Sequence, residues 1–408
     1  MDFTCFEITN RIKLHFMNND EKEFTTIGVF IRDKFADKSE ISALVPYFLN
    51  YCVPMDTFCN TFKVEELTAN VFRVRDVHVL QSNALISDNG QESINMFKDF
   101  FETLTDFFSM NWTLSIDFIN EAIAALNYQV SESLKEPLTM GLKKVQDEVH
   151  IGCPCGILPL SGHTDINKYN DCVVIKEYLE GLFKRITIDI YIAGALNNET
   201  ICNNAKEYLK LPANDLTNNT TFTFQSMEAY KEIEGNHIGE QDYLIYSYQI
   251  PENLVYTRWP AFCVFDGIMG SLPQSRLTKR FHESGLAYYA FSALDWIHGD
   301  FWILLGCNPK NVIATGQIIN EEIDRLKVEE IDMDELKIVI EALSIKFIRG
   351  INSNIYMHMR FDLECQICSF VCGIDQWLNG LNSVRPEDVS YIAVNLKPKV
   401  LYWSKGNI

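Results

Sequence analysis

The chain lacks long hydrophobic stretches. No run of about 18 or more apolar residues occurs in the sequence, whereas a helix that crosses a bilayer needs about 20 of them. Residues 1–20 also lack the basic end and the continuous apolar segment of a secretion signal. We therefore expect a cytoplasmic protein that has no membrane partner.

Positive charge is scarce as well. The sequence has 35 Lys and Arg against 55 Asp and Glu, which gives a formal net charge of −20. Proteins that bind nucleic acids or anionic membranes need a basic face, so we expect no nucleic-acid partner. A basic peptide or a basic partner subunit would suit this charge, and so would an acidic surface that only keeps the protein in solution.

Several patterns that carry chemistry are missing. The sequence has no G-x-S-x-G elbow, no P-loop and no G-x-G-x-x-G segment. Its eight histidines are widely spaced, so no two of them share one turn of a helix. Water attack on an amide requires an activated nucleophile, and no group of neighbouring residues supplies one. We expect no catalysis by this chain alone.

The twelve cysteines are scattered through a chain much larger than the small secreted domains that depend on disulfides, so reduced thiols are expected. Cys365, Cys368 and Cys372 have a spacing that suits an iron–sulfur or zinc site. The same positions, with Phe361 and Val371, also form one apolar face of a helix. Because free cysteine is among the most buried residue types, we favour three core residues over a metal site.

A duplication is the main organisational feature. Residues 117–126 and 334–343 have similar helical patterns, and we expect Asp117 and Asp334 to be the N-caps of these two helices. In each half an amphipathic helix precedes this helix, and a strand-like stretch precedes the amphipathic helix. The strand-like stretches are residues 67–80 in the first half and 286–305 in the second. The apolar positions of the two preceding helices are Ile94, Phe97, Phe101, Leu104 and Phe108 in the first half, and Val312, Ile319, Ile323 and Leu326 in the second.

The length of 408 residues suits two domains. Residues 212–240 are rich in Asn, Thr, Gly and acidic residues and have little periodicity, which is typical of a linker. We therefore predict homologous domains at 1–211 and 241–408. The pattern indicates an α+β fold, in which helices pack on a largely antiparallel sheet in each domain.

Five segments carry a resemblance to a known family. They are residues 26–32 (TIGVFIR), 42–51 (SALVPYFLNY), 265–270 (FDGIMG), 275–277 (SRL) and 285–292 (GLAYYAFS). In this order they resemble the insulinase, or pitrilysin, family of peptidases, and the match extends over nearly the whole chain. The length resembles that of the short bacterial and mitochondrial-processing branch, in which the two domains of a chain form half of a clamshell.

The family's zinc motif, H-x-x-E-H, is replaced by Tyr47-Phe48-Leu49-Asn50-Tyr51. Tyr47 and Tyr51 stand where the two zinc-binding histidines belong, and a Tyr hydroxyl keeps its proton up to about pH 10. Asn50 stands in place of the general base, and a neutral amide cannot take a proton from water. The resemblance thus implies a zinc-less member with no metal or other cofactor of its own. The family's further acidic ligand would correspond to Glu121, which we expect to be solvated.

In the family, an Arg and a Tyr of the second domain hold the substrate backbone. The Tyr corresponds to Tyr288, with Tyr289 beside it. The Arg position holds Phe281, and Arg280 is one step away, which on a helix is a rotation of about 100°. The resemblance therefore implies that Tyr288, Tyr289, Arg280 and His282 are the candidate substrate-binding residues, with the Arg role weakened.

The resemblance implies a non-catalytic subunit of a heterodimeric metallopeptidase. The zinc would lie in the partner subunit, and the substrate would be an unfolded peptide bound at a sheet edge. Maturation of a bacteriocin-like peptide and turnover of small peptides are both open as settings. The alternative is a peptide-binding or scaffold protein of the same fold with no proteolytic role, which the substitution at Phe281 favours.

Overall fold

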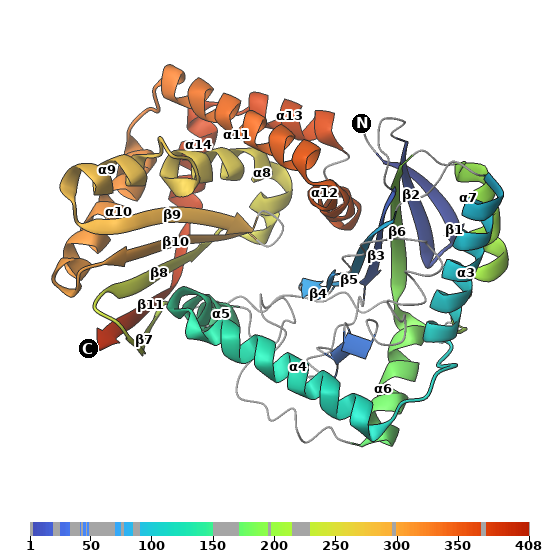
Figure 1. Ribbon diagram of the computed structural model, residues 1–408. Coiled ribbons are helices and arrows are strands. Elements are labelled where there is room, and N and C mark those ends of the chain that lie inside the picture. The colour runs from blue at the N-terminus through green and yellow to red at the C-terminus, as the bar shows by residue number, and fades with distance from the viewer. Residues whose placement is uncertain are drawn as a thin grey trace. The chain divides into compact units, whose positions relative to one another are not determined.

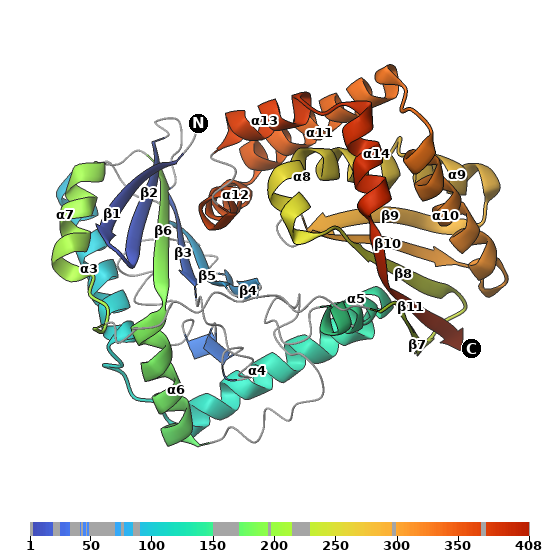
Figure 2. The ribbon, with the colours of Figure 1, turned by 180° about the vertical axis from the view of Figure 1, so that it is seen from behind.

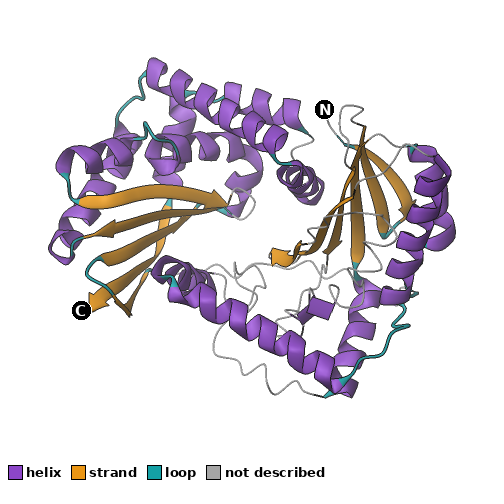
Figure 3. Cartoon of the chain, in the orientation of Figure 1, coloured by secondary structure: helices purple, strands orange, loops and turns teal. Residues whose placement is uncertain are grey.

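The computed structural model describes residues 3–18, 25–32, 41, 44–45, 47–48, 70–74, 77–84, 90–149, 171–194, 197–213, 229–295, 299–368 and 373–407. The chain divides into two compact units (Figure 1). Unit 1 comprises Met1–Glu132 and Gly152–Phe224, and unit 2 comprises Ser133–Ile151 and Gln225–Ile408. Each unit contains one sheet and its own set of helices (Figure 3).

The sheet of unit 1 has six strands in the order β1-β2-β6-β3-β5-β4. All neighbouring pairs are antiparallel except β2 and β6, which are parallel. The strands are β1 (Thr4–Thr9), β2 (Ile12–Asn18), β3 (Thr25–Arg32), β4 (Asn70–Val74), β5 (Val77–Ala84) and β6 (Thr187–Gly194).

The sheet of unit 2 has five strands in the order β7-β11-β8-β10-β9. Only β7 and β11 are parallel. The strands are β7 (Lys231–Ile238), β8 (Asp242–Gln249), β9 (Ala287–Asp295), β10 (Asp300–Cys307) and β11 (Lys397–Asn407). This order repeats the run β2-β6-β3-β5-β4 of unit 1, including the position of the parallel pair. The predicted α+β fold of two homologous domains is therefore confirmed, and β1 is an addition at one edge.

Phenylalanine side chains fill much of the core of unit 1. Phe97, Phe101, Leu104 and Phe108 of helix α3 (Gly90–Phe108) are all fully buried, as their helical spacing predicts. They pack together with the apolar residues of β2, β3 and β6. The other helices of the first half are α4 (Ile116–Lys135), α5 (Pro137–Val149), α6 (Cys172–Arg185) and α7 (Asn198–Tyr208).

Unit 2 has a helical layer on each face of its sheet. Successive residues of a strand point to opposite faces, and in β10 Phe301 and Ile303 belong to one core, whereas Trp302 and Leu304 belong to another. The first core lies under most of the unit's helices, which are α8 (Glu252–Asp266), a π-helix (Gly267–Ser271), α9 (Arg276–Ser284), a short 3-10 helix (Pro309–Asn311), α10 (Val312–Val328), α11 (Met333–Ser353), α12 (Ile355–Cys368), α13 (Ile374–Asn382) and α14 (Pro386–Asn395). Every position of β10 is buried as a result.

The second core is closed by α5, a helix from the first half of the sequence. Val145 and Val149 pack against Ile245 and Tyr402 of the unit 2 sheet, and a Cβ on Gly141 would lie 2.6 Å from the Tyr402 ring. The predicted first domain, residues 1–211, includes α5, whereas the structure places α5 in unit 2. An amphipathic pattern shows that a helix covers a sheet, but it does not show which of two similar sheets the helix covers.

Two further sequence expectations differ from the structure. The range 212–240 predicted as a linker includes β7, an edge strand whose residues are mostly exposed and therefore lack an apolar pattern; residues 214–228 lie outside the described part. Asp117 and Asp334 lie in the first turns of α4 and α11 rather than at their N-caps. Acidic residues are favoured both at the N-cap and in the first turn of a helix. The sequence alone therefore did not determine at which residue α4 and α11 begin.

Cys365 of α12 is buried in the first core of unit 2, which agrees with the interpretation as a core residue. The side chain of Cys368 and the whole of Cys372 lie outside the described residues, so the three-cysteine pattern stays a prediction. No helix in the described part of the chain combines the length and the hydrophobicity that a membrane span requires.

Candidate functional site

The candidate substrate-binding residues lie on α9 and on β9, which follows it. Helix α9 ends at Gly285, which adopts a left-handed conformation with φ of 65°. Its backbone N–H donates to the carbonyl of Phe281 at 2.9 Å, and glycine is favoured at such a position because it has no Cβ. The chain then enters β9, which packs against α9.

Tyr288 is strongly exposed to solvent. Its side chain is 67% exposed. It belongs to β9, which is an edge strand among the described strands because it pairs with β10 on one side and with no described strand on the other. A strand at such an edge presents backbone N–H and C=O groups that can pair with another chain. The phenol of Tyr288 and a row of backbone hydrogen-bonding groups therefore occur on the same strand.

Tyr289 points to the opposite face of β9 and is half-buried. Its ring stacks near that of Phe291 at a centroid distance of 6.2 Å. It also covers Gly306 of β10, where an added Cβ would lie 2.8 Å from the Tyr289 ring. Burial is the main cause that raises the pKa of Tyr289 above its ordinary value. These contacts make Tyr289 part of the packing between β9 and β10.

Phe281 is buried, with 3% of its surface exposed, and it belongs to the same core as Leu277. A guanidinium at this position would have to enter an apolar core. At the position where the resemblance places a substrate-holding Arg, the chain therefore has a packing residue of α9.

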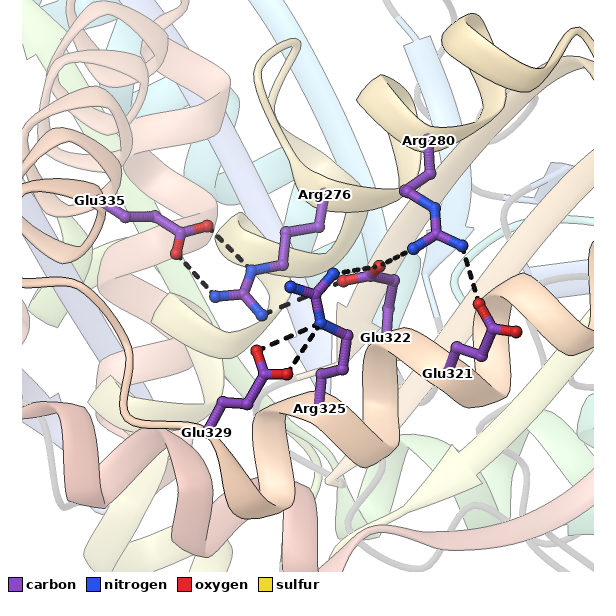
Figure 4. A network of polar contacts seen from close by, with 7 residues as sticks. All are labelled: Arg276, Arg280, Glu321, Glu322, Arg325, Glu329 and Glu335. Atoms are coloured by element: carbon purple, nitrogen blue, oxygen red, sulfur yellow. Dashed lines mark hydrogen bonds and ion pairs between the residues drawn. The ribbon is translucent and has the colours of Figure 1, made fainter.

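Arg280 is directed into a network of charged side chains (Figure 4). One nitrogen of its guanidinium donates to Glu322 at 2.9 Å, and the other donates to Glu321 at 2.7 Å. Both acceptors lie on α10. In this arrangement the charge of Arg280 is satisfied by two carboxylates, so it is not directed to the free edge of β9. His282, two positions further along α9, is exposed.

Glu322 is the centre of this network and is only 1% exposed. Besides Arg280, it accepts a hydrogen bond from Arg325 at 3.2 Å, and a nitrogen of Arg276 lies 4.0 Å from its other oxygen. Arg276 in turn donates two hydrogen bonds, at 2.9 and 2.7 Å, to Glu335 of α11. Three helices are therefore tied together around one buried carboxylate.

The glycine-rich segment after Asp266 is a buried π-helix rather than a surface loop. A Cβ on Gly270 would lie 2.6 Å from the backbone nitrogen of Ser292, and one on Gly267 would lie 2.8 Å from Val339. Both glycines are therefore required by close packing. The segment packs behind β9 and supports the strand that carries Tyr288.

Asp266 is a buried carboxyl at the start of this segment. Its Oδ1 accepts a hydrogen bond from the hydroxyl of Ser292 at 2.5 Å. Burial raises the pKa of Asp266 to about 6, although hydrogen bonds from Ser292 and Ser271 counteract part of this effect. No pattern in the sequence distinguished this residue, because its burial arises from tertiary packing.

Residues 47–51, where the resemblance places the family's zinc motif, belong to unit 1. Tyr47 is half-buried against the core of unit 1, and this burial raises its pKa to about 12, so the phenol keeps its proton and is a poor zinc ligand. Asn50 and Tyr51 lie outside the described residues. Glu121 is exposed on α4. Within the described ranges, no three His, Cys, Asp or Glu side chains are grouped as a metal site.

Comparisons with known proteins match part of the sequence and the whole fold. The model of one family, described as the peptidase M16 inactive domain, matches residues 174–343. A search of curated proteins finds no match.

Three solved structures are similar to the chain along nearly its full length. A conserved protein from Enterococcus faecalis has 16% identity and a TM-score of 0.78, with 100% of this chain and 99% of that chain covered. A protease from Helicobacter pylori has 14% identity and a TM-score of 0.79, with 99% of each chain covered. A peptidase M16 inactive domain from Pseudomonas fluorescens has 11% identity and a TM-score of 0.74, with 100% and 99% covered. At these identities the likeness concerns the fold.

Proposed function

We propose that the chain is a zinc-less member of the insulinase-type (M16) family, which the match at residues 174–343 and the similarity of fold support, and that it is the non-catalytic subunit of a two-chain metallopeptidase. Its role is to close one side of the chamber and to position a peptide for a partner subunit that carries the H-x-x-E-H helix. The observation that carries the proposal is the combination of an exposed Tyr288 on the edge strand β9 with a zinc position occupied by a protonated phenol.

In this proposal β9 and Tyr288 provide two kinds of contact to a peptide. The backbone of the edge strand pairs with an extended peptide and fixes its direction. The phenol of Tyr288 donates a hydrogen bond to the scissile carbonyl, and this bond strengthens as the carbonyl oxygen becomes negative. The buried π-helix behind β9 keeps the strand in place.

The partner supplies the chemistry that this chain lacks. It contributes the zinc ion and the general base, whereas this chain holds no metal or cofactor of its own. The formal charge of −20 suits a basic peptide substrate or a basic partner surface. Processing of a ribosomally made peptide such as a bacteriocin, in the cytoplasm, is the setting that we propose.

A second candidate function is favoured by Phe281 and Arg280. Phe281 is a core residue, and the guanidinium of Arg280 is engaged with Glu321 and Glu322. The Arg that holds the substrate in the family therefore has no counterpart at the corresponding position. This favours a peptide-binding or scaffold protein that holds a peptide without contributing to its cleavage.

The test is peptidase activity and zinc content of this chain purified alone and after co-expression with a zinc-motif homologue from the same genome. We expect a stable complex, with zinc and activity in the complex only. Replacement of Tyr288 with Phe should reduce kcat of the complex by about 100-fold, the effect of losing one oxyanion donor. The matched control is Tyr128→Phe on α4, because Tyr128 is 68% exposed and is no part of the site.

The two candidates give different results. A complex that is as active with Tyr288→Phe as without the substitution contradicts the positioning role. The absence of a complex with the homologue, together with binding of an unstructured peptide by this chain alone, supports the scaffold protein. Zinc and activity in the isolated chain would refute both.

A further inference from the structure

Ser292 of the edge strand β9 has two oxygen neighbours that belong to a single residue of the segment behind it. Its Oγ atom lies 2.5 Å from Oδ1 of Asp266 and 3.2 Å from the backbone carbonyl oxygen of Asp266. Both side chains are buried, with Ser292 4% and Asp266 7% exposed. Asp266 is the last residue of α8, so the two contacts join the end of this helix to β9.

The number of protons decides whether both contacts are full hydrogen bonds. A serine hydroxyl has one proton to donate, whereas a backbone carbonyl or an ionised carboxylate can only accept. When Asp266 is ionised, two acceptors share the one proton of Ser292. When Asp266 is protonated, its carboxyl O–H donates to the Ser292 Oγ, and the Ser292 hydroxyl donates to the carbonyl oxygen. The geometry is therefore fully satisfied only when the carboxyl carries a proton.

The surroundings of Asp266 compensate an ionised carboxylate only in part. Burial raises its pKa to about 6, and hydrogen bonds from Ser292 and Ser271 and then the charge of Lys346 on α11 counteract some of this effect. The thiol of Cys263, also on α8, is neutral because burial raises its pKa well above the ordinary value. Among the described residues of β9, α13 and α14, none adds a charge that changes the pKa of Asp266.

The backbone behind β9 leaves little space for Ser292 to move. A Cβ on Gly270 of the π-helix would lie 2.6 Å from the backbone nitrogen of Ser292 and 2.8 Å from its Oγ. Strand β9 pairs with β10 alone among the described strands, so its position depends on β10 and on the helices behind it. Detachment of β9 would separate Ser292 from Asp266 and let water reach the carboxyl.

We propose that Asp266 and Ser292 form a pH-sensitive latch that holds the edge strand β9 in place: the protonated carboxyl binds the Ser292 hydroxyl, and ionisation loosens the strand. The proton passes from the carboxyl to water, and no covalent bond between heavy atoms changes. Strand β9 also carries Tyr288, so the latch regulates the strand to which a peptide is assigned; this bearing on peptide binding rests on the proposed function. Asp266 is a positioning residue, because it acts through Ser292 and the strand.

The expected effect of pH follows from the proton that the closed latch binds. When β9 detaches, the pKa of Asp266 returns from about 6 to its ordinary value of 3.8. The detached state therefore binds fewer protons between about pH 4 and pH 6, and detachment becomes easier as the pH rises. The equilibrium constant for detachment should increase about tenfold between pH 5 and pH 7.5.

The experiment is hydrogen exchange of the full chain at pH 5 and pH 7.5, followed by mass spectrometry. Division by the exchange rate of an unstructured chain at each pH gives protection factors, which report local opening. We expect the protection of the β9 amides that bond to β10 to fall about tenfold between the two pH values. Strand β7 is the internal control, because it is the other edge strand of the same sheet and its detachment leaves Asp266 buried.

The outcomes for β9 and β7 decide the proposal. A fall in β9 with constant protection of β7 supports the latch. Constant protection of β9, or an equal fall in β9 and β7, overturns it, because the titration of Asp266 then acts on no local opening of β9.

Two variants separate the roles of the carboxyl and the hydroxyl. Asp266→Asn should make the protection of β9 independent of pH. Ser292→Ala should lower the protection of β9 about fivefold at pH 5, because one hydrogen bond is lost. The matched control is Ser247→Ala on β8, which changes a buried serine whose hydroxyl has no partner among the described residues and should leave β9 unchanged. If a variant fails to fold, the comparison of β9 with β7 in the wild-type chain decides.

The same measurement distinguishes failure of the latch from failure of the proposed function. A lysine-rich unstructured decapeptide suits the acidic chain, and if it pairs with the strand it should protect the β9 amides that face away from β10. A pH-dependent β9 whose outer amides the decapeptide does not protect supports the latch and contradicts peptide binding at this strand. Outer amides that the decapeptide protects, on a strand whose bonds to β10 do not respond to pH, support peptide binding and overturn the latch.

Discussion

The buried carboxyl of Asp266 gives a pH-dependent stability that can be calculated from the structure. Its pKa is about 6 in the folded chain, against a usual value of 3.8. Because the folded pKa is the higher one, the folded state binds more protons, and the stability of unit 2 falls as the pH rises from about 4 to about 7. A difference of about 2 pH units corresponds to a loss of about 3 kcal/mol at neutral pH.

The substitution Asp266→Asn removes this titration and keeps an oxygen that can accept the hydrogen bond from Ser292. Urea unfolding should be measured for both proteins at several pH values. The free energy of unfolding of the variant minus that of the wild type should increase by about 3 kcal/mol between pH 4 and pH 7. Asp324→Asn on exposed Asp324 of α10 is the control, and it should show a much smaller change. A difference between Asp266→Asn and wild type that is independent of pH would refute the reasoning.

Three more substitutions test the packing around β9, each by urea unfolding against the wild type. Phe281→Ala should destabilise unit 2 by about 3 to 5 kcal/mol, because it empties a core position; a small loss would mean that Phe281 is not a packing residue. Glu322→Gln should lower the free energy of unfolding by about 2 to 3 kcal/mol, because it weakens charged hydrogen bonds of a buried group. Glu321→Gln, which changes a largely exposed pair, should lower it by about 1 kcal/mol or less. Equal losses in the two variants would contradict a central role of Glu322 in the network. Gly270→Ala should cost about 1 to 3 kcal/mol, since its Cβ would lie 2.6 Å from a backbone nitrogen, whereas Gly350→Ala, with open space around it, should be neutral or slightly stabilising.

The parts of the fold that the sequence predicted are those set by local periodicity. The apolar spacing of Phe97, Phe101 and Leu104 gave a helix, and all three are buried as predicted. The duplication predicted that the two halves share one element order, and the two sheets share one strand order. Strand β7 was not recognised because an edge strand with exposed residues has no apolar alternation.

The sequence was informative about the candidate site where chemistry depends on residue type alone. A Tyr at the position where the resemblance places a zinc-binding His was evident from the sequence, and burial raises the pKa of this Tyr47 to about 12. It was uninformative where the role depends on tertiary contacts. The engagement of Arg280 with Glu322, and the raised pKa of Asp266, require the packing of helices and strands that lie far apart in the sequence.

The position of β11 has a consequence for how unit 2 forms. This strand lies between β7 and β8 in the sheet (Figure 2), yet it follows every other described element of the unit in the sequence. During synthesis, β7 and the β8-β10-β9 group therefore stay separate until residues 397–407 insert between them. Closing such long-range strand pairs is slow, because the entropy of a long loop is lost first. A ribosome that stalls before residue 397 would hold a chain with two unpaired strand edges, which is a form prone to aggregation.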